Sequence, residues 1–389
     1  MKPAVATRVP NFTWKQVLRR PALIVWCLFI ASQPIYILDS GLPQPGDFLL
    51  LPLIPLALSG WNRRLSPESA RPMRILMLFT GWVMLVNYAW ALITGNFGLV
   101  GKDTYLLFPI YYVYNASVVF VALVLYHRYG TRFLSLTLRL VLMTVLLQVL
   151  LSFFFHGTRI TRSSVLFNNP NQLGYFAMLS ACMIALCQRR LRYSTLLSGI
   201  GLTACVYLAL LSASKAGVGG TLLLLAVTVI ANPRVLVAAA IAIGLVLAVG
   251  GKIEQAIDTT HTRMLENRRP QHTFFEQRGY DRILQHKEHL LLGAGEGGTS
   301  RFSDTTVIGT HEIHSSAGTV LFSYGIAGAC LFLAFIVRVI QRASLRSALM
   351  LLPALAYTIA HQGLRFTSLW ILIGLFICIK QPPRDEPIE

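Results

Sequence analysis

Four cationic or imidazole side chains follow one another at regular spacing in the longest polar stretch of the chain. Arg278, Arg282, His286 and His289 are separated by 4, 4 and 3 residues. On a helix over 273–292 they would share one face. Such a row of donors can bind an anionic group such as a phosphate. The spacing also fits an amphipathic helix with a solvated face, and both interpretations stay open.

A further imidazole, His314, lies where this polar stretch meets the next apolar run. An ordinary imidazole has a pKa near 6.5, so it can take a proton from a hydroxyl group as a general base. A histidine at a membrane boundary can instead lie at the water interface without a chemical role. Zinc binding by His311 with His314, or His286 with His289, is disfavoured, because His-Glu-x-x-His needs one more residue between its histidines. We therefore expect no metal site.

Amides gather at the start of another apolar run, in Asn168-Asn169-Pro170-Asn171-Gln172, shortly after Arg159 and Arg162. Asn168 and Asn171 can bind the hydroxyl groups of a polar ligand, and Arg162 adds a cation. A capped helix start explains one asparagine and the proline, but not four amides in five residues.

Two more cations lie in short segments between apolar runs. Lys215, after Ser212-Ala213-Ser214, either belongs to a tight turn or binds an anionic headgroup. Arg365 stands near His361 as another outer cation. The glycine-rich run 293–298 permits close backbone approach, but it lacks the preceding strand and the Lys-Ser/Thr pair of a P-loop.

The acidic residues are distributed very unevenly. Nine of the 16 Asp and Glu lie between Glu254 and Glu312, and none lies inside the long apolar runs elsewhere. We therefore expect a membrane body without buried carboxylates, in which Arg and His handle an anionic substrate. A glycosidase would need two carboxylates about 5–10 Å apart.

Composition predicts an all-α polytopic membrane protein that forms a single membrane domain over residues 1–389. The chain is 54% hydrophobic and 13% charged, with a mean hydropathy of +0.59, whereas soluble domains have about 25% charged residues. Runs of about 20 apolar residues can cross a bilayer. About twelve crossings are expected, at 21–38, 47–61, 74–94, 104–126, 133–155, 164–187, 194–213, 216–232, 234–251, 315–340, 347–363 and 367–380.

The basic residues set the expected orientation. With both termini cytoplasmic, the short inner segments hold 19 Lys and Arg and the short outer loops hold five, as the positive-inside rule requires. This rule accounts for most of the net charge of +18, so nucleic acid is not an expected partner. Residues 252–314 become one large helical loop outside the cytoplasm, between the ninth and tenth crossings, and 381–389 a short cytoplasmic tail. The six cysteines fall in apolar runs and are expected to be unpaired core residues.

Four stretches together resemble the O-antigen ligase and O-antigen polymerase superfamily of bacterial membrane glycosyltransferases. The resemblance covers roughly residues 150–380, and the first five crossings match only in hydropathy. The matching stretches are Phe167–Gly174, similar to Phe-x-Asn-Pro-Asn-x-x-Gly; Arg278, about fifteen residues before Gly293-Ala294-Gly295; His314-Ser315-Ser316, followed by Gly325 and Gly328; and Leu364-Arg365, followed by Leu369-Trp370.

The chain also departs from the family pattern at two positions. Ser214-Lys215 stands where Ser-Arg is common, so the charge is kept but bidentate phosphate recognition is lost. Arg282 stands near a position where many members carry an aromatic residue.

The resemblance implies inverting transfer of a glycan from undecaprenyl diphosphate to a hydroxyl acceptor, at the periplasmic face of the inner membrane. It implies no metal, cofactor or nucleotide sugar. Arg278, with Lys215, Arg162 and either Arg282 or Arg365, would hold the diphosphate. His314 would accept the proton of the attacking hydroxyl.

Three functions remain open. A polymerase of O-antigen or exopolysaccharide repeat units is favoured slightly, and a chain-length regulator would then be a further partner. A ligase would attach the glycan to lipid A-core, or less commonly to protein. A transporter or flippase of lipid-linked glycans is the non-enzyme alternative, and it would need an ion-coupling residue.

Overall fold

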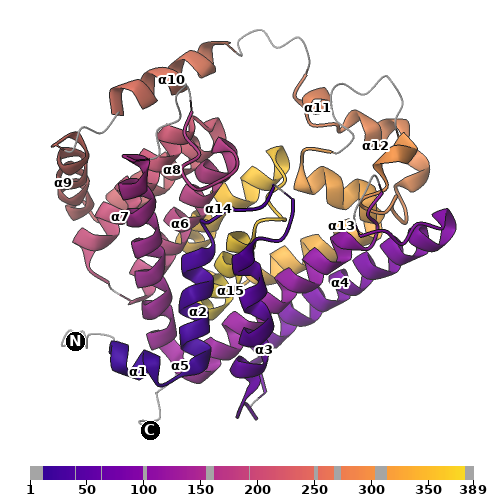
Figure 1. Cartoon of the computed structure of the whole chain (residues 1–389), viewed down its shortest axis with the longest axis horizontal. Helices are drawn as coiled ribbons and strands as arrows, with labels where there is room; N and C mark the ends of the chain where they lie inside the picture. The colour runs from indigo at the N-terminus through magenta and orange to yellow at the C-terminus, as the bar shows by residue number, and fades with distance from the viewer. Residues whose placement is uncertain are drawn as a thin grey trace.

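The structure is a computed structural model that describes residues 12–39, 41–62, 64–99, 103–154, 162–191, 193–248, 253–266, 273–302 and 313–381. Over these ranges the chain is all-α, with fifteen α-helices and no β-strand. Figure 1 shows α1 (Trp14–Leu18) at one end of the helical body, and α10 (Ile253–Glu266), α11 (Phe274–Gln277) and α12 (Asp281–Gln285) at the opposite end. The expected tail lies outside these ranges from residue 382 onward.

The chain is a multi-pass membrane protein by the length and hydropathy of its helices. Among the described residues five helices are long and apolar enough to cross a bilayer, and six apolar helices are shorter. The long helices are α4 (Pro67–Thr94), α5 (Leu107–Ser152), α6 (Pro170–Leu191), α7 (Thr195–Ser212) and α13 (Ser316–Ile340). The shorter ones are α2 (Pro21–Ser32), η1 with α3 (Pro45–Leu49 and Leu50–Leu58), α8 (Lys215–Ala231), α9 (Arg234–Ala248), α14 (Leu345–Ala360) and α15 (Thr367–Lys380).

The crossings expected at 104–126 and 133–155 are the two halves of α5. Their junction is Gly130, whose φ of 58° and ψ of −140° interrupt the helical geometry. Glycine adopts this backbone conformation at little steric cost, so the chain changes direction there without a loop.

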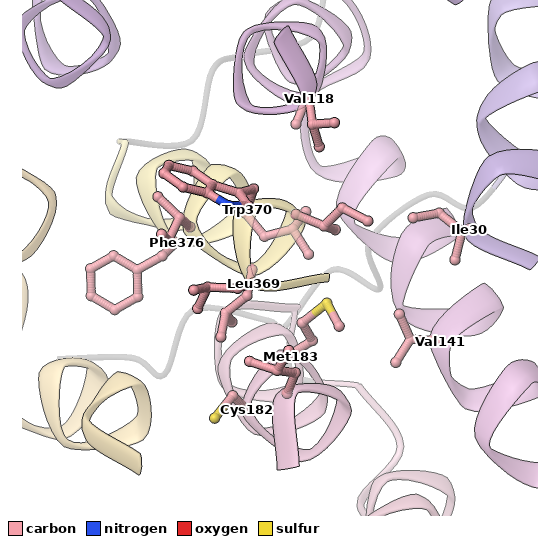
Figure 2. Packing of buried hydrophobic residues seen from close by; sticks show 14 of the residues in the cluster. Ile30, Val118, Val141, Cys182, Met183, Leu369, Trp370 and Phe376 are labelled. Carbon is pink, nitrogen blue, oxygen red and sulfur yellow. The ribbon is translucent and has the colours of Figure 1, made fainter. Parts of the chain in front are cut away.

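The core is centred on α6 and α15, which pack against each other and against α5. Figure 2 shows Trp370 and Leu369 of α15 among side chains of α5 and α6, including Val118 and Met183. Trp370 is fully buried, and its indole N–H donates to the carbonyl oxygen of Leu364 at 2.7 Å. This bond fixes the start of α15, directly after the turn that carries Arg365.

All six cysteines are unpaired, as expected. Their burial differs from the expectation at two positions. Cys330 is exposed and Cys27 is half-buried, whereas the other four belong to the core.

Three segments that were expected on the cytoplasmic side meet at residue 381. The Gln381 amide donates to Ser69 Oγ at 2.6 Å, and Gln381 Oε1 accepts from Ser66 Oγ at 3.2 Å. Arg190 donates to the Gln381 carbonyl oxygen at 2.7 Å. The start of α4, the end of α6 and the end of α15 therefore lie on one side of the body.

The expectation of one helix over 273–292 is wrong. The described chain forms α11, α12 and a single 3-10 turn, η2 (Lys287–His289), instead. Gly279, with a φ of 72°, separates α11 from α12, and His286 leaves helical geometry at a φ of −117° and a ψ of 58°. Arg278, Arg282, His286 and His289 therefore do not share one helical face.

Candidate active site

A cavity of about 470 Å³ lies between α2, α5, α6 and the polar segments that precede α13 and α15. Its volume is in the range of about 300–1,000 Å³ that small-molecule sites occupy. Of the eight site residues expected from the sequence, four line this cavity. They are Asn171, Arg278, His314 and Arg365.

Arg278 and His314 are joined through their main chains. The backbone N–H of His314 donates to the carbonyl oxygen of Arg278 at 3.0 Å. Arg278 ends α11, and the burial of its guanidinium lowers the pKa below the usual 12.5. A guanidinium stays charged at neutral pH even so, and it therefore presents a half-buried cation to the cavity beside an imidazole.

His361 completes this cluster, although its position in the sequence marks it only as a neighbour of Arg365. Its Nδ1 lies 3.5 Å from a terminal nitrogen of Arg278, and its ring stacks on Tyr357 with centroids 4.4 Å apart. Its carbonyl oxygen accepts the backbone N–H of Ser316 at 3.1 Å, which ties the end of α14 to the start of α13.

His361 follows the last residue of α14, outside that helix, and it is held neutral. Burial, then the positive charge of Arg278, then His314, lower its pKa from 6.5 to about 4. A neutral imidazole can accept a hydrogen bond from Arg278 through Nδ1. The cavity therefore combines a cation with two imidazoles that come from distant parts of the chain.

Arg365 is paired with a buried carboxylate. Its guanidinium lies 2.8 Å from Glu296 Oε1, and the Glu296 side chain is 6% exposed. Glu296 Oε2 also accepts from Tyr324 at 2.8 Å and from Tyr112 at 3.3 Å. The guanidinium of Arg365 in turn lies over the ring of Phe108, 4.6 Å from its centroid.

The expectation of a membrane body without buried carboxylates is therefore wrong. Glu296 belongs to the loop in sequence, but the loop folds inward and places it against α5 and α13. Asp47, at the start of the second apolar run, lines the 470 Å³ cavity, where its carboxylate accepts from Tyr114 at 2.9 Å and from the backbone of Gln44 at 2.8 Å. Counting acids along the sequence could not show this, because burial depends on which side chains the fold places around them.

The amide-rich stretch both caps α6 and contributes to the cavity. Asn169 Oδ1 accepts the backbone N–H of Gln172 at 3.1 Å, and Gln172 Oε1 accepts the backbone N–H groups of Asn168 and Asn169. This reciprocal arrangement satisfies the helix start. Asn171 remains at the cavity, where Arg162 donates to its Oδ1 at 2.6 Å.

Arg162 and Asn168 are placed beside the cavity and do not line it. Arg162 also donates to the carbonyl oxygen of Ser212 at 2.9 Å, which connects the amide stretch to the end of α7. Asn168 donates through its side chain to the carbonyl oxygen of Leu38 at 2.6 Å.

Lys215 begins α8 and is not among the residues that line the 470 Å³ cavity. The residues before it form the tight turn that was one of the two interpretations. Ala213 has a φ of 46°, and the Ser214 hydroxyl caps α8 by accepting from Gly217. Arg162 contacts this turn through the carbonyl oxygen of Ser212.

Arg282 lies in a second environment. Its side chain is 3% exposed, and it lines a cavity of about 30 Å³ together with Glu296 and Arg365. Its guanidinium is 5.9 Å from the centroid of Phe302. The rings of His286 and His289 pack edge-on against Phe302. The four-residue series seen in the sequence therefore divides between the main cavity and an aromatic cluster.

The two glycine motifs pack against each other. Gly325 interrupts α13 with a φ of 67°, and a Cβ there would lie 2.3 Å from the carbonyl oxygen of Leu291. A Cβ on Gly293 would lie 2.3 Å from the carbonyl oxygen of Ser323. Three main-chain bonds join the two segments: Ala294 N–H to Phe322 O at 2.9 Å, Gly295 N–H to Ser323 O at 2.9 Å and Ile326 N–H to Leu290 O at 2.7 Å. These glycines dock the loop onto α13 and so place Glu296 beside Arg365.

No group of three or more His, Cys, Asp or Glu side chains that could hold a metal ion occurs within the described residues. His311, half of one metal pair considered from the sequence, lies outside those ranges.

Compared with known proteins, the chain matches no family model and no curated protein. The functional assignment therefore depends on the chemistry of the cavity and on the motif resemblance.

Proposed function

We propose that the protein transfers a glycan from a lipid diphosphate to a hydroxyl acceptor. The observation that carries the proposal is the convergence of Arg278, His314, His361 and Arg365 on one cavity. Cations can bind and stabilise the diphosphate leaving group, and an imidazole can take the proton of the acceptor hydroxyl. The four residues come from three separate segments of the chain, so their meeting is a property of the fold.

The motif resemblance supports the same proposal. The stretches similar to the O-antigen ligase and O-antigen polymerase superfamily are far apart in sequence, and each contributes a residue or a contact to this region. Asn171, Arg278, His314 and Arg365 line the cavity, and the glycine motifs dock the loop beside it. We accordingly propose membership of this superfamily, with undecaprenyl diphosphate as the lipid carrier.

The reaction then follows from the groups present. The acceptor hydroxyl oxygen attacks the anomeric carbon of the donor sugar, and its proton passes to the imidazole of His314. The bond between the anomeric carbon and the phosphate oxygen breaks, and the diphosphate leaves with the electron pair. Arg278 and Arg365 neutralise the charge that develops on it. Attack opposite the leaving group inverts the anomeric configuration.

We also propose twelve crossings, a position in the bacterial inner membrane and a periplasmic location of residues 252–314. The excess of basic residues in the short segments on the opposite side supports this orientation. The cluster at Gln381, which joins three of those segments, lies on a side of the body that we assign to the cytoplasm.

Two carboxylates favour one alternative, a transporter of lipid-linked glycans. Asp47 and Glu296 are acidic groups in or beside the cavity, and ion-coupled transport needs such groups. Glu296 is already neutralised by Arg365. A transporter moves its cargo between two compartments and forms no glycosidic bond, so the two functions differ in a single-compartment assay.

The test is transfer by the purified protein in detergent micelles, with an undecaprenyl-diphosphate-linked glycan as donor. Two acceptors are offered separately, a second lipid-linked repeat unit and lipid A-core. Extension of the first would identify a polymerase, and glycosylation of the second a ligase. Excess chelator should leave the rate unchanged. An acceptor protein is offered as a third substrate. If the protein binds the donor but glycosylates none of the three acceptors, the proposed transfer is rejected.

A further inference from the structure

Two buried polar atoms at the inner wall of the main cavity have no hydrogen-bond partner among the described residues. They are Asn115 Oδ1 on α5 and the Tyr175 hydroxyl on α6. Asn115 is 2% exposed and Tyr175 is 1% exposed, and both line the cavity. Leaving such an atom unpaired in a buried site costs about 1–3 kcal/mol. An unpaired buried atom on a residue that lines a cavity indicates that a ligand in the cavity satisfies it.

The two side chains contact one turn. The Asn115 amide nitrogen is 3.4 Å from the carbonyl oxygen of Leu364. A Cβ on the preceding Gly363 would lie 2.6 Å from the Tyr175 hydroxyl. The absence of a side chain at Gly363 therefore leaves the room that the Tyr175 hydroxyl occupies. His361 and Arg365 flank this turn in the chain, and both line the same cavity as Asn115 and Tyr175.

The surrounding wall has the chemistry of a sugar site. An amide oxygen accepts hydrogen bonds, and a phenol can donate or accept. The carboxylate of Asp47 keeps acceptor capacity beyond its bonds to Tyr114, Gln44 and Thr367, because a carboxylate has about four lone-pair sites. The wall also carries the ring of Tyr111, whose apolar face can pack against the C–H groups of a sugar.

We propose that Asn115 and Tyr175, with Asp47 at the rim, form a saccharide-binding subsite beside the Arg278 and His314 cluster. The inference rests on the proposed glycan transfer and names the residues that hold the sugar next to the diphosphate. The hydroxyl groups of the sugar donate to Asn115 Oδ1 and Asp47, and accept from or donate to the Tyr175 hydroxyl. A polyprenyl tail in the same place would leave both buried atoms unpaired, which is costly.

The experiment uses Asn115→Leu and Tyr175→Phe in the full-length protein. Each substitution removes the polar atom and keeps a similar shape. Gln148→Leu is the matched control, because Gln148 is a buried amide on the same helix with both polar atoms unpartnered among the described residues, and it does not line the cavity. Binding is measured for two probes, sugar-free undecaprenyl diphosphate and the lipid-linked glycan that serves as donor. Thermal unfolding is recorded for every variant.

Each cavity variant should bind the glycan-bearing probe about five- to tenfold more weakly, the loss of one or two neutral hydrogen bonds. Binding of the sugar-free probe should be unchanged. The unfolding temperature of Tyr175→Phe should hold or rise, because an unpaired buried atom has been removed, whereas Asn115→Leu also loses the contact with Leu364 and should be slightly less stable. Gln148→Leu should bind both probes normally. An equal loss of binding for both probes would overturn the saccharide subsite and assign this wall of the cavity to the lipid. Unchanged binding of both probes would also overturn it, and would show that only ordered water pairs with the two atoms.

Failure of the subsite can be told apart from failure of glycan transfer. If Arg278→Gln weakens binding of both probes while the cavity variants bind normally, the diphosphate site stands and the saccharide subsite is rejected. If the native protein binds neither probe, the proposed donor is wrong and the saccharide subsite is rejected as well.

Discussion

The backbone N–H of His314 donates to the carbonyl oxygen of Arg278 at 3.0 Å, so the fold fixes these two residues relative to each other without using their side chains. Substitution of either side chain leaves this bond in place. Loss of function in such variants therefore reports on the chemistry of the imidazole or the guanidinium, and folding is expected to be retained.

Arg278→Lys should reduce the rate of glycan transfer at least about tenfold although the charge is kept. A lysine presents a point charge, whereas the guanidinium offers paired N–H donors to a diphosphate. The control is Arg234→Lys, at an exposed position at the start of α9, which should transfer normally. The rate is measured with purified protein and lipid-linked donor. A rate within twofold of the native value for Arg278→Lys would remove Arg278 from the donor site.

Glu296→Gln should destabilise the protein by about 3 kcal/mol, because it leaves a half-buried guanidinium without its counter-charge. This value is at the lower end for a broken buried pair, since the Arg365 side chain is 27% exposed. Glu288→Gln is the matched control, because Glu288 is 60% exposed, and its effect should stay within about 0.5 kcal/mol. Thermal unfolding in detergent compares the two. Equal stability of the two variants would show that the Arg365 pair contributes nothing.

Gly325→Ala should disrupt the docking of the loop and cost more than about 2 kcal/mol, because the backbone is left-handed and the new Cβ meets main-chain atoms. Gly219→Ala, where a Cβ meets nothing within 4 Å, should be neutral or slightly stabilising. Limited proteolysis of the loop and unfolding temperature are the measurements. A tightly docked loop in Gly325→Ala would contradict the packing of the two glycine motifs.

The stability of the protein should fall as the pH drops from about 6.5 toward 4. His361 has a lowered pKa in the folded state, so between these values the unfolded chain binds a proton that the folded chain does not, and stability rises with pH over this window. His361→Asn should flatten this part of the curve. His261→Asn, at an exposed position on α10, is the control. An unchanged slope in His361→Asn would mean that another group titrates.

Much of the helical architecture was predictable from hydropathy, because long apolar runs must form helices in a bilayer. The runs at 194–213 and 315–340 correspond closely to α7 and α13. The junction in α5 was placed correctly between two runs, but its form was not predictable, since a single glycine with positive φ replaces a polar loop.

The site was predictable only in part, for a physical reason. Asn171, Arg278, His314 and Arg365 could be named from the sequence because their residue types and spacing resemble a known motif pattern. The helix over 273–292 was wrong because Gly279 and His286 leave helical geometry, which spacing alone does not reveal. Asp47, Glu296 and Asn115 were missed because their importance depends on which groups surround them in the folded chain.

The central claim is tested most directly by single-turnover transfer with His314→Ala and an undecaprenyl-diphosphate-linked donor. The account predicts normal protein level and normal donor binding, with a transfer rate reduced about 10²- to 10⁴-fold, the usual contribution of a general base. His261→Ala should transfer at the native rate. A His314→Ala protein that forms product within a few fold of the native rate would contradict the assignment of His314 as the base and, with it, the proposed mechanism.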